Sequence, residues 1–203
     1  MLVDHGFIRS IYFNLHPISD KMWRSAQPGP SHVRRLASRG VKTILNLRGV
    51  NDSGHYHLEK KTCEENGITL VSFPVSSRDM PKVEWVLGLR DIFNEIEYPA
   101  VLHCKSGADR AGLAATLYAY VHEGRTLDDA MDQMSIKYGH IKQAKTGMID
   151  HFFLSYKRRN LESPIEFFEW VEGEYAEKRL ELKEEFMARG WASVLVDTIL
   201  RRE

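Results

Sequence analysis

A cysteine and an arginine separated by five residues are the pair in this sequence best suited to chemistry on phosphate. Cys104 and Arg110 flank a short segment that contains Gly107, and a helix-forming run follows. A cysteine thiolate is a nucleophile, and a helix N-terminus both lowers a thiol pKa and binds phosphate oxygens. The planar arginine fork fits two oxygens of a phosphate. The segment therefore predicts a loop that binds a phosphate group and attacks it.

The residues between this pair suit the cradle that such a loop needs. Successive backbone N–H groups in a glycine-containing turn form an anion-binding nest, and glycine adopts the positive φ of such a turn. The expected phosphate-binding residues are Lys105, Ser106, Gly107, Ala108, Asp109 and Arg110. The thiolate and the arginine supply the nucleophile and the charge, so we expect neither a metal ion nor a cofactor.

Alternating strands and helices are predicted to position this loop. The expected strands are Ile11–Leu15, Met22–Ser25, Val41–Leu47, Ile68–Phe73 and Pro99–His103. The expected helices are Ser31–Gly40, His55–Asn66, Pro81–Ile96 and a run after Gly112. Thr126 is expected to cap a further helix, and Lys137–Lys145 to join two helices in the helical stretch that ends at Arg159. This order predicts an α/β fold with a central, mostly parallel sheet flanked by helices. Catalytic loops then lie at the carboxyl ends of strands, where Cys104 falls.

Two motifs carry a resemblance to a known family. His103 and Cys104, followed by a glycine and then Arg110, resemble the signature loop of the cysteine-based protein tyrosine phosphatases, and most of all their compact dual-specificity branch. The run Trp23–Pro28 resembles a segment near the start of bacterial dual-specificity-like phosphatases. The resemblance implies a dual-specificity phosphatase-like fold and a phosphomonoester hydrolase that acts through a cysteinyl-phosphate intermediate. It makes Cys104 the nucleophile and Arg110 the clamp.

One position departs from the family pattern. The family usually carries Ser or Thr after the arginine, where it helps the thiolate leave in the second step, and this chain has Ala111. A slower second step is one expectation, with Gln143 as a candidate for orienting its water. A catalytically weak pseudophosphatase that only binds phosphate is another. A lysine directly after the cysteine, here Lys105, resembles the signature loop of phosphoinositide phosphatases. This resemblance adds an inositol phosphate or a phosphoinositide as an alternative substrate. Those relatives carry a second lysine where this chain has Ala108, which weakens the alternative.

Phosphate ester cleavage also needs an acid to protonate the leaving oxygen, and two aspartates compete for that role. Asp79 follows a strand and precedes a helix, where the family's mobile acid loop falls. Asp109 lies inside the signature loop, where some relatives carry an aspartate thought to be the acid. We place Asp79 first, because a loop aspartate can approach the leaving group from the side opposite the thiolate. Helix capping and a helix-dipole contact are their respective structural alternatives.

Several neighbours are expected to support the site. His103 is expected to tune the thiolate rather than move a proton. Arg24 and Gln27 are either rim residues of the site or parts of a structural turn. Arg48 ends a strand at the same edge, where it either faces the substrate anion or pairs with a carboxylate.

The last forty residues are expected to form a separate helical extension. Ser163-Pro164 interrupts the chain, and aromatic residues then recur at helical spacing. Glu177–Arg189 is a charged helix-forming run, and Gly190 is expected to break it before a second amphipathic run. We therefore predict a phosphatase domain at 1–162 and a C-terminal helical extension at 163–203, which packs on that domain or mediates self-association or docking.

Composition narrows the class of protein further. The 28 Lys and Arg residues equal the 28 Asp and Glu residues, so no global field favours nucleic acid or membrane. No segment approaches 18 uninterrupted apolar residues, so stable membrane insertion is not expected. Cys63 and Cys104 do not make a disulfide framework, and a reactive thiolate needs reducing surroundings. We expect a cytoplasmic protein whose partner is a phosphorylated protein or small phosphomonoester. Reversible pairing of Cys63 with Cys104 under oxidants stays open.

Overall fold

The computed structural model describes residues 13–141 and 145–200, and contacts within the chain divide it into two compact units. Within the described range, the first unit comprises the residues up to Ser76 together with Gly88–His140, and we call it the sheet unit. The second comprises Ser77–Leu87 and the residues from Ile141 onward, and we call it the helical unit. The domain boundary expected after residue 162 remains a prediction.

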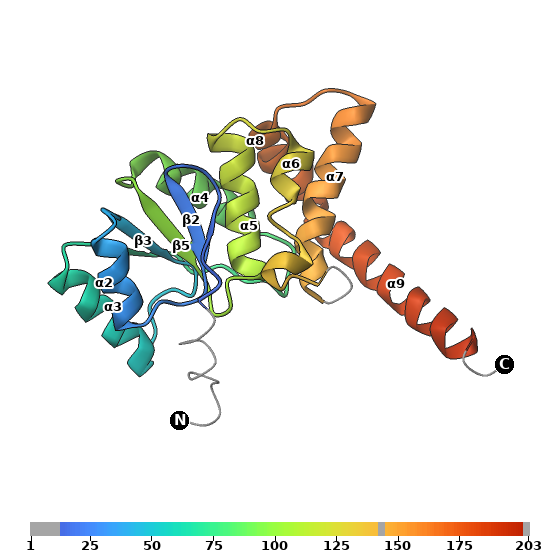
Figure 1. Ribbon diagram of the computed structural model, residues 1–203. Coiled ribbons are helices and arrows are strands. Elements are labelled where there is room, and N and C mark those ends of the chain that lie inside the picture. The colour runs from blue at the N-terminus through green and yellow to red at the C-terminus, as the bar shows by residue number, and fades with distance from the viewer. Residues whose placement is uncertain (1–12, 142–144, 201–203) are drawn as a thin grey trace. The chain divides into compact units, whose positions relative to one another are not determined.

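The sheet unit is built on a five-stranded sheet with the order β1-β2-β5-β3-β4. Its three inner strands, β2, β5 and β3, are labelled in Figure 1. Its strands are β1 (His16–Pro17), β2 (Met22–Ser25), β3 (Thr43–Asn46), β4 (Thr69–Ser72) and β5 (Ala100–His103). β2, β5, β3 and β4 pair in parallel, whereas β1 pairs antiparallel with β2. The predicted mostly parallel sheet is confirmed. The strand expected at Ile11–Leu15 is wrong over its described part, because residues 13–15 form no strand and the first pairing begins at His16.

The register of the sheet gathers three strand ends around the loop that follows β5. His103 pairs with Ser25 on one side and with Asn46 on the other. The chain segments that continue from these three residues therefore leave the sheet at one edge. In open α/β sheets this carboxyl edge is where ligands bind.

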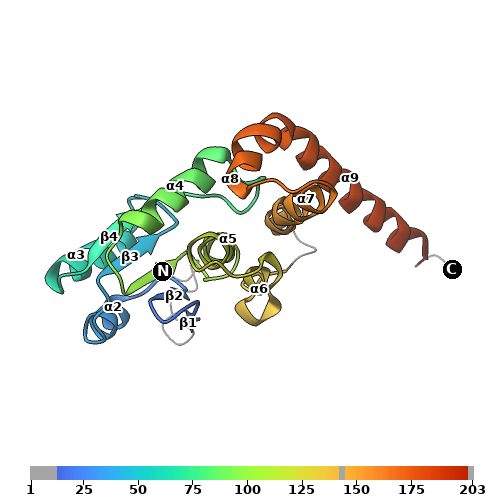
Figure 2. The ribbon, with the colours of Figure 1, turned by 90° about the horizontal axis from the view of Figure 1, so that it is seen from above.

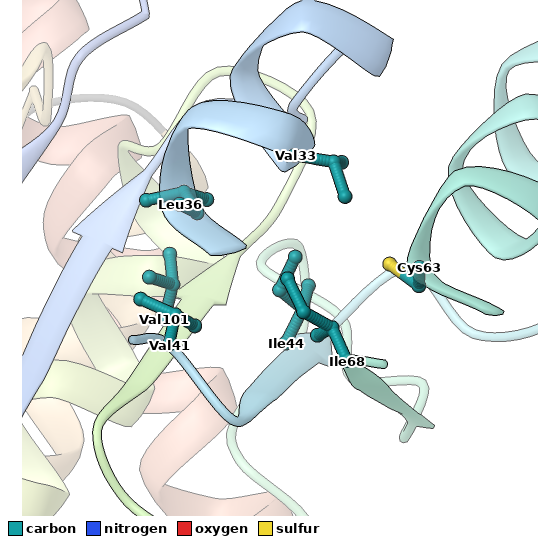
Figure 3. Packing of buried hydrophobic residues seen from close by; sticks show 7 residues of the cluster. All are labelled: Val33, Leu36, Val41, Ile44, Cys63, Ile68 and Val101. Carbon is teal, nitrogen blue, oxygen red and sulfur yellow. The ribbon is translucent and has the colours of Figure 1, made fainter. Parts of the chain in front are cut away.

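Helices cover both faces of the sheet, as predicted. Figure 2 shows α2 (Pro30–Ala37) and α3 (Gly54–Glu65) on one side and α4 (Val83–Glu95) on the other. Ile44 of β3 and Val101 of β5 pack with α2 and α3 in an apolar cluster (Figure 3). Because side chains alternate along a strand, Leu45 and Leu102 face the opposite side, and both are fully buried. The sheet is thus buried on both faces, and this packing fixes the strand ends from which the loops start.

After β5 the chain forms α5 (Asp109–Leu117), a π-helical turn (Tyr118–His122) and α6 (Leu127–Met131). Thr126 caps α6 as predicted, since its Oγ1 accepts a hydrogen bond from the Asp129 amide at 3.2 Å. The connection expected at Lys137–Lys145 between two helices is found over its described part, and the helix after it begins at Met148. Two 3-10 turns, Ile136–Tyr138 and Lys145–Gly147, separate α6 from the next helix. Gly139 ends the first of them at φ 83°, a left-handed conformation that stops a helix.

The helical unit contains α7 (Met148–Glu162), α8 (Phe167–Trp170), a π-helical turn (Val171–Tyr175) and α9 (Ala176–Leu200). Aromatic rings in edge-to-face and tilted contacts form its core, among them Phe152, Phe167, Trp170 and Tyr175. The chain break predicted at Ser163 is confirmed, but α9 runs straight through Gly190. An interior glycine costs a helix only about 1 kcal/mol, which the helix-forming residues around it outweigh.

Candidate active site

The predicted strand–loop–helix order is found at Cys104. This residue follows β5 directly and is 2% exposed. The loop ends at Ala108, the N-cap residue of α5, whose carbonyl accepts the Gly112 amide at 2.7 Å. The loop amides therefore lie at a helix N-terminus, which carries partial positive charge.

Gly107 is the one loop residue whose type the backbone dictates. Its φ is 77°, and a Cβ placed there would lie 2.7 Å from the Ser25 carbonyl carbon and 2.8 Å from the Ala26 amide nitrogen. Both neighbours are backbone atoms, so neither can rotate away. The loop thus packs directly on the chain that leaves β2, and a side chain at position 107 would push the two apart.

Gly107→Ala is expected to displace the loop and to lower kcat/KM at least about tenfold, since strain and clash together exceed the 1.4 kcal/mol that a factor of ten represents. The measurements are kcat/KM and the affinity for inorganic phosphate. Gly124→Ala is the matched control, because Gly124 has φ 68° but open space around its Cα. Equal effects of the two variants would contradict the close packing of the loop.

Arg24 lies beneath the loop rather than at its rim. The residue is fully buried, and its Nη2 donates hydrogen bonds to the carbonyl oxygens of Gly107 at 2.7 Å and Ala108 at 2.9 Å. Its guanidinium stacks 4.1 Å from the centroid of the Tyr138 ring, and its Nη1 donates to the Gln133 carbonyl. Burial lowers the pKa of Arg24 to about 10 against the opposing charges nearby, so the side chain is still a cation at neutral pH. The rim position expected for Arg24 is therefore wrong, and the structural alternative holds.

The carbonyl groups of the whole loop are held from one side. The Asn14 side chain donates a hydrogen bond to the Ser106 carbonyl at 2.9 Å, and the backbone N–H of Gln27 donates one to the Lys105 carbonyl at 3.5 Å. Arg24 holds the next two carbonyls. In a trans peptide the C=O and N–H groups point in opposite directions, so the amides that follow these carbonyls face the other side. Amides that share one side of a loop suit the anion-binding nest that the sequence predicts.

Asp109 and Arg110 occupy the first turn of α5. Asp109 Oδ1 lies 2.8 Å from Nδ1 of the buried His140, which orients the carboxylate. The Arg110 side chain is half-buried, and among the described residues it has no hydrogen-bond or ion-pair partner. Lys105 and Ser106 are exposed, whereas Ala111 is fully buried. The free guanidinium suits a phosphate clamp.

A buried polar network lies behind the nucleophile. His103 Nε2 is 2.7 Å from Glu59 Oε1, and both side chains are fully buried. Glu59 Oε2 accepts a hydrogen bond from Gln27 Nε2 at 2.9 Å, and Gln27 Oε1 accepts one from Arg48. Sequence reasoning missed Glu59. The spacing could have revealed it, because Glu59 lies three residues after Tyr56 and four before Cys63. This helical spacing places Glu59 on the buried face of α3.

Asp79 belongs to the helical unit, where two cations of α9 hold it. Its Oδ1 lies 2.9 Å from Lys183 Nζ, its Oδ2 lies 3.5 Å from Arg179 Nη1, and Oδ1 also accepts the Met80 amide. Burial works to raise the pKa of Asp79, but its hydrogen bond to Lys183 and the two positive charges outweigh burial and lower it. This environment favours the ionised carboxylate, which is the wrong form for a general acid. Gln143, the candidate for orienting water, lies outside the described residues.

Cys63 lies in the apolar cluster between α3 and the sheet, beside Ile44 and Ile68 (Figure 3). Burial, with the nearby charges of Glu59 and Glu64, raises the pKa of its thiol to about 12. The thiol therefore stays protonated at neutral pH, which disfavours a rapid role as a resolving thiol. Both cysteines are free in the structure.

Comparison with known proteins assigns the family. A family model described as "DSP-PTPase phosphatase fused to NAD+ Kinase" matches residues 16–149, well over half of the chain and all of the signature loop. The chain belongs to this family of dual-specificity-type protein tyrosine phosphatases. It is also similar to the dual specificity protein phosphatase TpbA of Pseudomonas aeruginosa strain UCBPP-PA14, with 30% identity over 122 residues, 60% of this chain and 53% of that protein. The chain spans about half the length of the curated relatives that it matches.

Solved structures share the fold. The crystal structure of P. aeruginosa TpbA superimposes with a TM-score of 0.55 at 24% identity and covers 71% of this chain and 91% of that chain. A putative phosphatase of Shewanella putrefaciens CN-32 gives a TM-score of 0.57 at 17% identity, over 76% of this chain and 96% of that chain. A putative phosphatase of Neisseria meningitidis gives 0.53 at 21% identity, over 68% and 98%. No helix among the described residues is both long and apolar enough to span a bilayer.

Proposed function

We propose that this protein is a cysteine-dependent phosphatase that hydrolyses phosphotyrosine or a small phosphomonoester. The observation that carries the proposal is the preformed loop, in which four consecutive carbonyls are held from one side. Cys104 precedes these carbonyls, and Arg110, which has no partner in the described part of the chain, follows them. A fixed nest of N–H groups stabilises charge on a phosphoryl group without reorganisation. The choice of phosphotyrosine is supported by a solved structure of a cysteine-to-serine variant of TpbA in complex with pTyr.

The proposed reaction has two steps. The Cys104 thiolate attacks phosphorus, the S–P bond forms, and the P–O bond breaks with its electron pair going to the leaving oxygen, which an acid protonates. The loop amides and Arg110 hold the three remaining oxygens. Water then attacks the cysteinyl-phosphate, gives its proton to the same carboxylate, and releases inorganic phosphate and the thiolate.

For the acid we propose Asp109 rather than Asp79, which reverses the order favoured by the sequence. Asp109 belongs to the same loop–helix segment as the nucleophile, and its contact with His140 fixes its orientation. Asp79 is engaged by Lys183 and Arg179 in a setting that keeps it ionised. A general acid must instead hold a proton at the moment the leaving group departs.

Ala111 supports a second candidate, a phosphate-binding module with little turnover. The methyl group of Ala111 is fully buried in the position where the family usually has a hydroxyl to assist the second step. The two candidates differ in one observable. A slow second step accumulates phosphoenzyme, whereas a binding module forms none.

The test is phosphate release from para-nitrophenyl phosphate in the presence of EDTA, followed by acid quenching and mass spectrometry of the peptide that contains residue 104. We expect turnover without added metal ion and one phosphate on Cys104. Tight binding of a phosphotyrosine peptide without turnover or phosphoenzyme would establish the binding module instead. Inositol phosphates and phosphoinositides in the same assay test the alternative substrate class.

We also propose a location for the protein and a role for its C-terminal extension. A cytoplasmic location suits a mechanism that depends on a reduced thiolate. The C-terminal extension carries an exposed apolar residue, Leu180 of α9, which supports a role in self-association or docking. Light scattering of the full chain, before and after Leu180→Glu, distinguishes self-association from a monomer.

A further inference from the structure

Glu59 is a buried carboxylate that the proposed reaction does not use directly. Its side chain is fully excluded from solvent in α3, a helix that contributes no residue to the loop. A carboxylate in such a place is costly unless a partner compensates its charge. The compensating group is His103, the residue before the nucleophile, with Nε2 at 2.7 Å from Glu59 Oε1.

The two nitrogens of the His103 ring both face acceptors. Nδ1 lies 3.3 Å from the Cys104 carbonyl oxygen, while Nε2 faces Glu59. The Nε2–Oε1 contact is close but not aligned as a hydrogen bond, since neither atom has a hydrogen-bond partner among the described residues. At this distance the carboxylate is stabilised by charge attraction, which an imidazolium supplies and a neutral imidazole does not. The second oxygen of Glu59 is occupied by Gln27 Nε2 at 2.9 Å, so the carboxylate is held in place from two sides.

We propose that Glu59 is a positioning residue that keeps His103 as an imidazolium, and that this fixed positive charge beside Cys104 stabilises the thiolate. The inference rests on the proposed function, in which Cys104 is the nucleophile. Gln27 extends the same network to Arg48, which lies at the carboxyl edge of β3. The network therefore ties the charge behind the nucleophile to a cation at the edge of the site.

Other charges also surround the nucleophile and remain in place when Glu59 is changed. They are Arg24 from β2, Lys105 in the loop, and Asp109 and Arg110 in the first turn of α5. A change from Glu59 to Gln keeps the shape of the side chain and its capacity to accept from Gln27. It removes only the charge that His103 faces.

The test measures thiol reactivity, which does not require turnover. In Glu59→Gln, alkylation of Cys104 by iodoacetamide is expected to be about tenfold slower, measured at a pH below the midpoint of the thiol titration. The reason is that a neighbouring charge typically shifts the pKa of an ionisable group by about one unit or more. Cys104→Ser gives the background from Cys63. Glu64→Gln is the matched control on the same helix, with a side chain 66% exposed, and is expected to alkylate at the wild-type rate.

Two further measurements show whether Glu59 acts through His103. His103→Asn is expected to slow alkylation as much as Glu59→Gln does, and the double variant no further. The ¹⁵N spectrum of His103 in the wild type is expected to show both ring nitrogens protonated at neutral pH, and only one in Glu59→Gln. Unchanged alkylation in a folded Glu59→Gln, additive effects in the double variant, or a neutral ring in the wild type would each overturn the proposal.

The proposal stays testable if Glu59→Gln does not fold. Glu59→Asp keeps the charge but shortens the side chain, and an intermediate slowing of alkylation is expected. Wild-type alkylation in a folded Glu59→Asp would count against the close contact. The proposed function fails separately, if Cys104→Ser retains turnover, because the alkylation rates and the ring spectrum do not depend on catalysis.

Discussion

Cys104→Ser is expected to abolish turnover, with a loss of at least about 10⁴-fold in kcat, because a serine hydroxyl stays protonated at neutral pH and is a far weaker nucleophile than a thiolate. Phosphate affinity should persist, since the loop amides and Arg110 bind the oxygens without help from the thiol. The measurements are kcat for para-nitrophenyl phosphate and the affinity for a phosphotyrosine peptide by calorimetry.

Cys63→Ala is the matched control for this variant. Cys63 is buried in the apolar cluster and its thiol pKa is raised to about 12, so its removal should leave kcat unchanged apart from a small cost in stability. Turnover that survives Cys104→Ser would rule out the covalent mechanism. Turnover lost in both variants would point to damage to the fold instead.

Asp109→Asn is expected to slow hydrolysis of an alkyl phosphate by about 10² to 10⁴-fold, the range typical for loss of a general acid. Asparagine can still accept a hydrogen bond from His140, so the local geometry is preserved. The loss should shrink for para-nitrophenyl phosphate, whose leaving group departs without protonation. The basic limb of the pH–rate profile should disappear as well.

Asp79→Asn is the comparison that decides between the two aspartates. Asp79 pairs with Lys183 and Arg179 in the helical unit, and its replacement should weaken that contact while sparing the leaving-group dependence. If Asp79→Asn instead shows the larger loss for poor leaving groups, the order favoured by the sequence was right. A uniform loss over all leaving groups in Asp109→Asn would indicate a disturbed loop rather than a missing acid.

The parts of the fold that sequence predicted are those whose causes are local. Gly107 and the run after Gly112 define a turn and a helix within ten residues, and the alternation of apolar strands with helices defines the sheet. Thr126 and Ser163 marked helix ends correctly, because caps and breaks depend on immediate neighbours. The break expected at Gly190 failed, because a glycine weakens a helix without ending it.

The parts of the site that sequence missed depend on contacts between distant segments. Asn14 is 92 residues from Ser106, whose carbonyl it holds, and nothing in its neighbourhood announces that partner. Asp79 has the local setting of an acid loop, but its ionisation is governed by Lys183 and Arg179 about a hundred residues later. Arg24 was visible as part of a motif, although only its burial distinguishes a support from a rim residue.

The contact between Arg24 and the loop also determines at which stage of folding the site forms. Arg24 and Gly107 are 83 residues apart, so closing that stretch of chain must come before the loop carbonyls are held. The ends of so long a stretch rarely meet in an unfolded chain, and their high effective concentration is supplied by the parallel pairing of β2 with β5. An excised peptide of residues 100–117 would carry the cysteine and the arginine but no organised nest. The phosphate affinity that we propose is therefore a property of tertiary structure, and it should appear and vanish with cooperative folding of the sheet.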